Sequence, residues 1–149
     1  MTLLEEAFQK ENYRPISFSL NAVGHPTISL KVRNETATFL LDTGAASNIL
    51  DDDFAKKIGL TLIPTGQKGG GAGGLIHDIY SIGNLEIYYE DLKFIFDQFF
   101  SMNFISIREA FKAKGVKDEF QGILGFGFFK QNNCFIDYTK NRIYVKTQL

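Results

Sequence analysis

The stretch that decides the fold is Thr38-Phe39-Leu40-Leu41-Asp42-Thr43-Gly44-Ala45, in which an apolar strand leads an aspartate into a sharp turn. Gly44 lets the backbone approach closely and leaves its N–H free to face a carboxylate. Ala45 keeps this crowded turn small. Asp42 is therefore a candidate functional carboxylate, with the Gly44 N–H placed to face it.

Alternating apolar residues predict several short strands on both sides of this stretch. Upstream, the pattern predicts strands over 16–22, 28–32 and 36–41, with turns at 24–26 and 34–35. Residues 64–74 contain many glycines and are predicted to form a loop. Farther along, we expect strands over 75–82, 85–89 and 93–99, a turn at Gly83-Asn84, and a closing hairpin over 135–145.

Helices are expected to be few and short. Residues 3–13 fit an amphipathic helix, and Asp51 is a suitable N-cap for a helix over 54–58 that stops at Gly59. Ser106-Ile107-Arg108-Glu109 matches a capping box for a helix that runs to Lys114. Many strands with two or three short helices predict a mainly β fold, closed or nearly closed into a barrel.

The length of 149 residues predicts one domain. Pro15 ends the N-terminal helical pattern, so we expect residues 1–15 to form an arm and residues 16–149 to form the domain. Cys134 is the single cysteine, which excludes an internal disulfide and a cysteine-based metal cluster.

Composition and charge exclude several partners. Sixteen basic and 17 acidic side chains give a formal charge of −1, so nucleic acid is not an expected partner. No run reaches the roughly 18 apolar residues that a membrane helix needs. Acidic residues near the N-terminus do not fit a signal peptide, so the sequence predicts a cytoplasmic protein that does not enter membranes.

Three motifs together resemble those of retropepsin-like aspartic proteases. They are Phe39-Leu40-Leu41-Asp42-Thr43-Gly44-Ala45, the glycine-rich Gly71-Ala72-Gly73-Gly74, and Gly122-Ile123-Leu124-Gly125. The closing stretches Phe135-Ile136-Asp137-Tyr138 and Ile143-Tyr144-Val145 resemble the end of the bacterial single-domain relatives. The resemblance covers about residues 16–145 and implies a retropepsin-like closed barrel with a flap hairpin.

The resemblance also implies a mechanism. The chain has one Asp-Thr-Gly loop, so two chains would form a homodimer in which the two Asp42 carboxylates share one proton and activate a water. Such an aspartic endopeptidase would hydrolyse a peptide or protein substrate without a cofactor or a metal. The implied catalytic residues are Asp42, Thr43 and Gly44. The implied substrate-binding residues are Ala45, Gly71, Ala72, Gly73, Gly74, Ile123 and Leu124.

Two departures from the retroviral pattern concern assembly. Retroviral members usually have an aspartate after Asp-Thr-Gly-Ala and an arginine after the later apolar-apolar-glycine motif, and the two form a salt bridge. Ala46 and Phe126 stand at these positions, so the dimer contact must differ. The spacing between the two motifs is also longer, with the additional residues near 97–119, which would cover a barrel end or build the dimer interface.

Other readings of these residues remain open at the level of sequence. Asp42 could simply finish a strand, or the fold could serve as a catalytically inactive dimerisation or peptide-binding module. Gly69, Gly71 and Gly74 satisfy a dinucleotide-binding spacing, but a strand-like run follows where that motif needs a helix. Asp51-Asp52-Asp53 lacks the spacing of a calcium loop, so no metal site is expected there.

Overall fold

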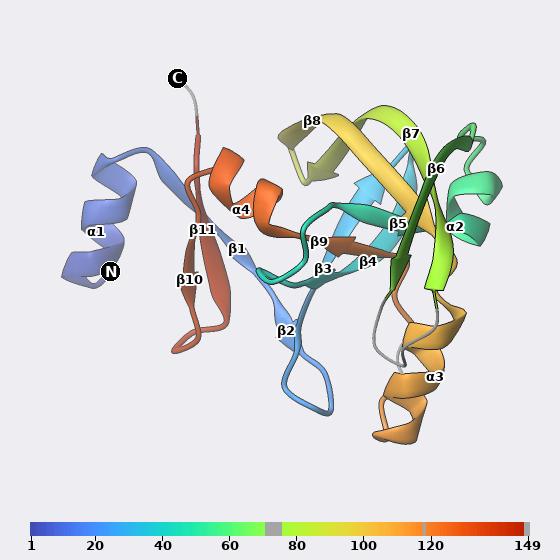
Figure 1. Ribbon diagram of the computed structural model, residues 1–149. Coiled ribbons are helices and arrows are strands. Elements are labelled where there is room, and N and C mark those ends of the chain that lie inside the picture. Colours follow the sequence, from blue (N-terminus) through green and yellow to red (C-terminus); the bar gives the residue numbers. More distant parts are fainter. Residues whose placement is uncertain (71–75, 118, 148–149) are drawn as a thin grey trace.

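The computed structural model describes residues 1–70, 76–117 and 119–147 (Figure 1). These residues form two sheets and four helices with the segments that connect them. The helices are α1 (Leu3–Lys10), α2 (Asp52–Lys57), α3 (Ile105–Ala113) and α4 (Phe126–Gln131). The strands are β1 (Tyr13–Ser17), β2 (Ser19–Leu20), β3 (Pro26–Val32), β4 (Glu35–Leu41), β5 (Ile49–Asp51), β6 (Ile63–Gly70), β7 (Ile76–Tyr89), β8 (Leu92–Met102), β9 (Gly122–Leu124), β10 (Phe135–Asp137) and β11 (Arg142–Lys146).

The larger sheet is closed into a ring. Its strands follow the order β2-β3-β4-β9-β5-β8-β7-β6, and β3 also pairs with β7 through Lys31 and Tyr88. The ring therefore runs from β3 through β4, β9, β5, β8 and β7 back to β3. The mainly β, closed-barrel fold predicted from the sequence is confirmed.

Aromatic and branched aliphatic side chains fill this barrel. On β3, Ile28, Leu30 and Val32 are buried while the residues between them are exposed, as period-two alternation requires. Phe39 of β4 and Phe99 of β8 are fully buried in the same cluster. A second apolar cluster lies under α3, so the additional residues between the two motifs have a core of their own.

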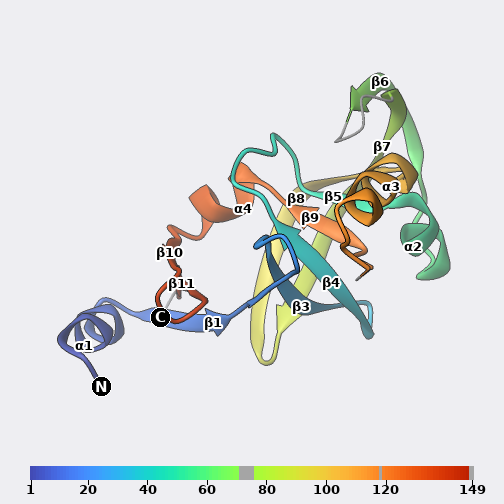
Figure 2. The ribbon, with the colours of Figure 1, turned by 90° about the horizontal axis from the view of Figure 1, so that it is seen from below.

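The smaller sheet has the order β1-β11-β10 and carries α1. Thr2 and Glu5 form a capping box at the start of α1, so the helix expected within residues 3–13 is present. Phe8 stacks on Tyr144 of β11 with ring centroids 4.0 Å apart. Figure 1 and Figure 2 both place α1 at one end of the molecule and α3 toward the other.

Two predictions around the glycine-rich stretch are wrong. Residues 63–70 form β6 and pair with β7, although the sequence pattern predicts a loop from residue 64. The segments expected as two strands joined by a turn at Gly83-Asn84 form the single strand β7. Gly83 has a φ of +73° and sits at a register shift against β8, so it makes a bulge within one strand.

The predicted capping box of α3 is also wrong. The helix begins at Ile105, with Phe104 as its N-cap and no side-chain cap, so Ser106 lies within the first turn. The Ser106 hydroxyl instead lies 2.6 Å from Nε2 of His77 on β7. Asp51 is the N-cap of α2, as predicted, but its side chain does not cap that helix and is used elsewhere.

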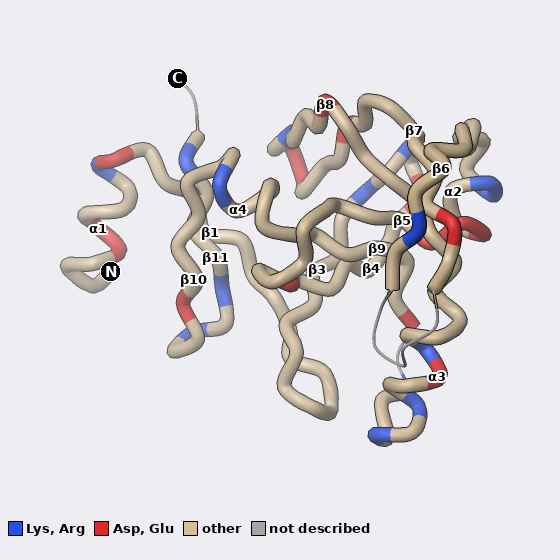
Figure 3. Tube along the Cα trace, in the orientation of Figure 1, with Lys and Arg blue, Asp and Glu red and all other residues tan. Residues whose placement is uncertain are grey.

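Basic and acidic residues interleave along the described chain (Figure 3). They are frequent in α1, in α2 and at the end of α3, whereas β9 carries none. Among the described residues, none of the helices combines the length and the apolar character that a membrane span requires.

Asp52, at the start of α2, is an acid buried in the fold, with 9% of its surface exposed. Burial raises its pKa above the usual value, and the nearby Asp51 acts in the same direction. A carboxyl group whose pKa is raised on folding binds protons more tightly in the folded state, so its ionisation destabilises the fold as the pH rises.

We expect Asp52→Asn to raise the melting temperature at pH 7.5, because the amide removes a buried charge. The gain should shrink as the pH falls and the wild-type carboxyl becomes protonated. Asp53→Asn is the matched control, since Asp53 occupies the same helical turn but is exposed. Thermal unfolding from pH 4 to pH 8 measures both, and a gain that does not depend on pH would contradict the prediction.

Candidate active site

The backbone at the end of β4 holds Asp42 in a hydrogen-bonded loop. The Asp42 N–H donates to the Leu124 carbonyl at 2.9 Å, and the Ala45 N–H donates to the Asp42 carbonyl at 3.1 Å. The Gly44 N–H donates to Oδ1 of Asp42 at 3.0 Å, as the turn chemistry predicts. The Asp42 side chain remains exposed, so its carboxylate is fixed on one side and accessible from the cleft.

The second motif supports this loop from the next strand of the barrel. β9 runs parallel to β4, with Leu40 opposite Ile123 and Leu41 opposite Leu124. Just beyond β9, the Gly125 N–H donates to Oδ1 of Asn48 at 2.8 Å.

Gly125 must be a glycine for steric reasons. A Cβ atom at this position would lie 2.6 Å from the carbonyl oxygens of both Ala45 and Ser47. Real Cβ atoms do not approach backbone oxygens so closely, so a side chain here would displace the Asp42 loop. The next residue continues the contact, because the Phe126 N–H donates to the Ala45 carbonyl at 2.9 Å.

A cleft of about 980 Å³ opens beside this loop. This volume is at the upper end of the range typical of ligand sites, roughly 300–1,000 Å³. Its walls come from the Asp42 loop, from β6, from the turn between β2 and β3, from α3 and from the β10–β11 hairpin. The cleft therefore joins segments that are far apart in the sequence.

The predicted site residues have different places around this cleft. Asp42, Thr43, Gly44, Ala45 and Ile123 line it. Leu124 is fully buried and contributes its carbonyl to the Asp42 N–H, so it supports the loop from beneath. The predicted flap residues Gly71, Ala72, Gly73 and Gly74 lie outside the described residues, although the preceding Gly69 and Gly70 of β6 line the cleft.

Other residues of the site were missed from the sequence. Asn48 reaches Gly125 across 77 positions of the chain, and no local pattern marks that contact. His25, Ile107 and Phe111 line the cleft from the β2–β3 turn and from α3. The helical spacing of apolar residues on α3 predicts that one face of the helix is buried, but not which segment it faces. Only the assembled fold therefore shows that these residues line the cleft.

The titratable groups limit the chemistry of the cleft. Among the described residues, Asp42 is the one acid that lines it. Cys134 is outside the cleft, and burial raises the pKa of its thiol to about 12, so the thiolate is scarce near neutral pH. His25, Lys68, Lys114 and Tyr138 also line the cleft, but catalysis by a pair of carboxylates would need a second acid from elsewhere.

The barrel and its Asp-Thr-Gly loop define a class of protein, the single-domain aspartic proteases of the retropepsin type. The family model described as aspartyl protease matches residues 28–128, which is more than half of the chain. The chain belongs to this aspartyl protease family. A comparison with curated proteins gives no match.

Solved structures give the same fold at low sequence identity. The retroviral protease-like domain of Ddi1 from Leishmania major is 14% identical, with 83% of this chain and 90% of that chain covered and a TM-score of 0.58. A retropepsin-like aspartic protease from Rickettsia conorii is 19% identical, with coverages of 89% and 91% and a TM-score of 0.57. The EIAV protease in complex with the inhibitor HBY-793 is 16% identical, with coverages of 80% and 98% and a TM-score of 0.55.

We expect Gly125→Ala to lower the free energy of unfolding by about 1–3 kcal/mol, because the added methyl group overpacks the loop against β9. Gly127→Ala is the matched control, since its Cβ atom would meet nothing closer than Asn48 Nδ2 at 3.7 Å. Urea denaturation of the two variants and the wild type measures the difference. Equal stability of the two variants would contradict the steric role of Gly125.

Proposed function

We propose that the protein is an aspartic endopeptidase that works as a homodimer, with one Asp42 from each chain at a shared site. The observation that carries the proposal is the Asp42 carboxylate itself, which is exposed to the cleft and held by the Gly44 N–H at 3.0 Å. Because Asp42 is the only acid lining the described part of the cleft, a site with two carboxylates needs a second chain.

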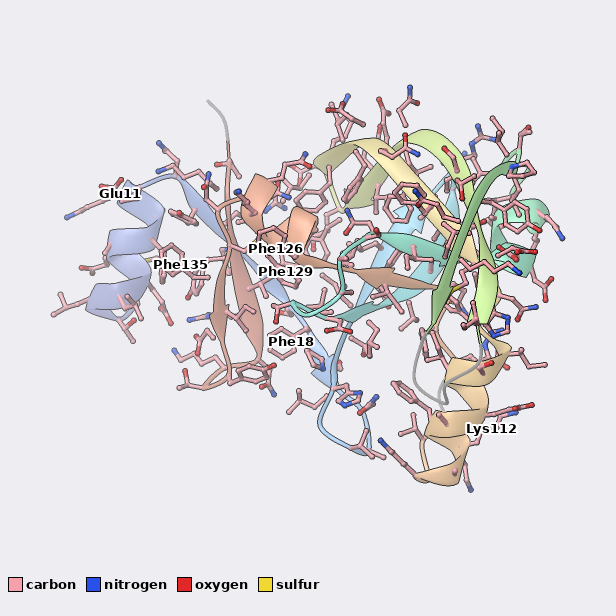
Figure 4. All side chains as sticks on the ribbon, viewed as in Figure 1. Glu11, Phe18, Lys112, Phe126, Phe129 and Phe135 are labelled. Carbon is pink, nitrogen blue, oxygen red and sulfur yellow. The ribbon has the colours of Figure 1, made fainter. Side chains whose placement is uncertain are left out.

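Exposed apolar side chains next to the loop support a contact with a second copy. Phe126, Ile136 and Tyr138 have 54%, 39% and 59% of their surface exposed, whereas the Phe135 ring packs against Phe8 of α1. Figure 4 shows Phe126 at α4 and Phe135 between β10 and α1. A contact of this kind is apolar, which agrees with Ala46 and Phe126 standing where retroviral members have a salt bridge.

Two Asp42 carboxylates that meet across a two-fold axis would share one proton. The ionised carboxylate would take a proton from a water bound between the two chains. The protonated carboxyl would donate a hydrogen bond to the oxygen of the scissile carbonyl. The water then adds to the carbonyl carbon, and the resulting tetrahedral intermediate collapses when its nitrogen receives a proton and the C–N bond breaks.

The residues around Asp42 would then orient the reactants. Gly44 donates to the carboxylate and keeps it facing the cleft. Thr43 is exposed beside it and is proposed to bind the backbone of the second chain. Ala45 and Ile123 line the cleft and are proposed to contact the peptide. An extended substrate would add to the exposed backbone of β6, in the manner of strand addition.

We expect the wild-type protein to cleave peptides of a mixed library, and Asp42→Asn to lose this activity by about 10²- to 10⁴-fold or more. Asp53→Asn makes the same chemical change at an exposed residue outside the cleft and should keep full activity. Mass spectrometry of the products measures cleavage. Equal cleavage by wild type and Asp42→Asn, or cleavage by neither, would contradict the proposal, and binding without cleavage would indicate a peptide-binding module.

A site shared by two chains makes a second prediction. Adding an excess of Asp42→Asn chains to a fixed amount of wild type should progressively lower the activity, because wild-type chains become trapped in mixed dimers with one carboxylate. Asp42→Asn carrying an additional charge at the contact, Phe126→Glu, should inhibit less. Activity that is insensitive to added Asp42→Asn chains would show that each chain acts alone.

A further inference from the structure

The Lys, Arg, Asp and Glu side chains that line the cleft are few, and most of them are basic. Among the described residues they are Asp42, Lys68 and Lys114. The chain as a whole has 16 basic and 17 acidic side chains, so the cleft differs from the rest of the protein in the sign of its charge. If two Asp42 carboxylates share one proton, the pair carries a single negative charge, while each cleft still has two lysines.

Lys68 is an exposed residue of β6, the strand at the end of the larger sheet. One edge of β6 pairs with β7, and its other edge is open to an added strand. Asp78 of β7 stands opposite Lys68, but it does not line the cleft. Among the described residues Lys68 takes part in no ion pair, so its ammonium group is available to a ligand.

Lys114 is the C-cap residue of α3 and is exposed. A cation is favourable at the end of a helix, and Lys112 in the last turn also meets this need. Lys112, labelled in Figure 4, does not line the cleft, whereas Lys114 does. Within the part of the chain that the structure describes, Lys114 forms no ion pair either, so its position in the cleft needs a separate explanation.

The elements that carry the two lysines are joined to each other. His77 of β7 pairs with Gly69, the residue after Lys68, and its Nε2 lies 2.6 Å from the hydroxyl of Ser106 on α3. Ser106 has 4% of its surface exposed, so this contact is buried. Figure 1 and Figure 2 both show β6, β7 and α3 on the same side of the molecule. Lys68 and Lys114 therefore belong to one connected part of the cleft wall.

We propose that Lys68 and Lys114 form a basic subsite that selects an acidic side chain, Asp or Glu, of an extended peptide. A peptide strand added to the open edge of β6 places the side chain opposite Lys68 on the same face of the sheet as the lysine, and oppositely charged cross-strand pairs attract. Lys114 adds a second positive charge from α3. This inference rests on the proposed peptidase function and names its substrate class, peptides with an acidic residue at one position.

A peptide series with Glu, Gln or Lys at each position in turn tests this subsite. At one position the wild type should prefer Glu over Gln by about 5-fold in kcat/KM, the upper end for one oppositely charged pair. Lys68→Gln and Lys114→Gln should each lower this ratio, and the double variant should bring it to about one. Lys57→Gln on α2 and Lys112→Gln on α3 remove the same charge outside the cleft and should keep the wild-type ratio.

Charge reversal separates this role from a merely structural one. Lys68→Glu should invert the preference at that position, so that the Lys peptide is cleaved faster than the Glu peptide. Raising the salt concentration from about 0.05 M to about 0.5 M should weaken the wild-type preference, because salt screens exposed charges. Melting temperatures check that each variant is folded. If folded Lys68→Glu and the double variant keep the wild-type Glu-to-Gln ratio, the basic subsite is refuted even though the enzyme is active.

Binding separates this inference from the proposed function. The labelled Glu and Gln peptides are titrated against Asp42→Asn with and without Lys68→Gln, and fluorescence anisotropy gives the dissociation constants. Tighter binding of the Glu peptide that depends on Lys68, without cleavage by the wild type, would support the subsite and refute the peptidase. A labelled single-stranded oligonucleotide that binds more tightly than the Glu peptide, again through Lys68, would overturn the assignment to peptides. Absence of both cleavage and peptide binding would overturn the subsite together with the function.

Discussion

The parallel pairing of β4 with β9 is the constraint on which the rest of this structure depends. It places the end of β4, which Asp42 follows directly, beside Gly125. The Asp42 N–H therefore donates a hydrogen bond to the Leu124 carbonyl at 2.9 Å. Two hydrogen bonds then hold the loop after Asp42 against this segment. The Gly125 N–H donates to Oδ1 of Asn48, and the Phe126 N–H donates to the Ala45 carbonyl. Because Gly125 has no side chain, two backbone segments can approach closely enough for these bonds to form.

This arrangement gives a hydrogen-bonded loop that presents one carboxylate to the cleft. Buried strands and backbone hydrogen bonds hold the loop from beneath, and among the described residues the Asp42 carboxylate has no ion-pair partner. A lone accessible carboxylate in a large cleft can bind and orient a water, but acid–base catalysis of amide hydrolysis needs both a proton donor and an acceptor. Catalysis by two carboxylates would therefore depend on the association of two chains.

The segment around α3 is anchored to the same two strands. It has its own apolar cluster, yet that cluster includes residues of β4 and β9, so the helix is continuous with the support of the loop. The buried Asp51 carboxylate does not cap α2. It accepts a hydrogen bond from the Phe104 N–H and forms an ion pair with the Arg108 guanidinium. These contacts fix the start of α3 against the strands that support the Asp42 loop.

Alternation of apolar residues and local turn chemistry were enough to predict the mainly β fold and the turn after Asp42, whereas Gly125 was singled out by its resemblance to a retropepsin-like motif. The β6 strand and the bulge at Gly83 were missed, since glycine-rich segments form strands only when a neighbour such as β7 supplies the hydrogen bonds. Three contacts could be found only in the folded protein. The Gly125 N–H donates to the Asn48 side chain, and the Ser106 hydroxyl lies beside the His77 ring. The His25 ring packs against Phe111. These contacts join residues far apart in the chain, and the packing that brings them together has no local signature.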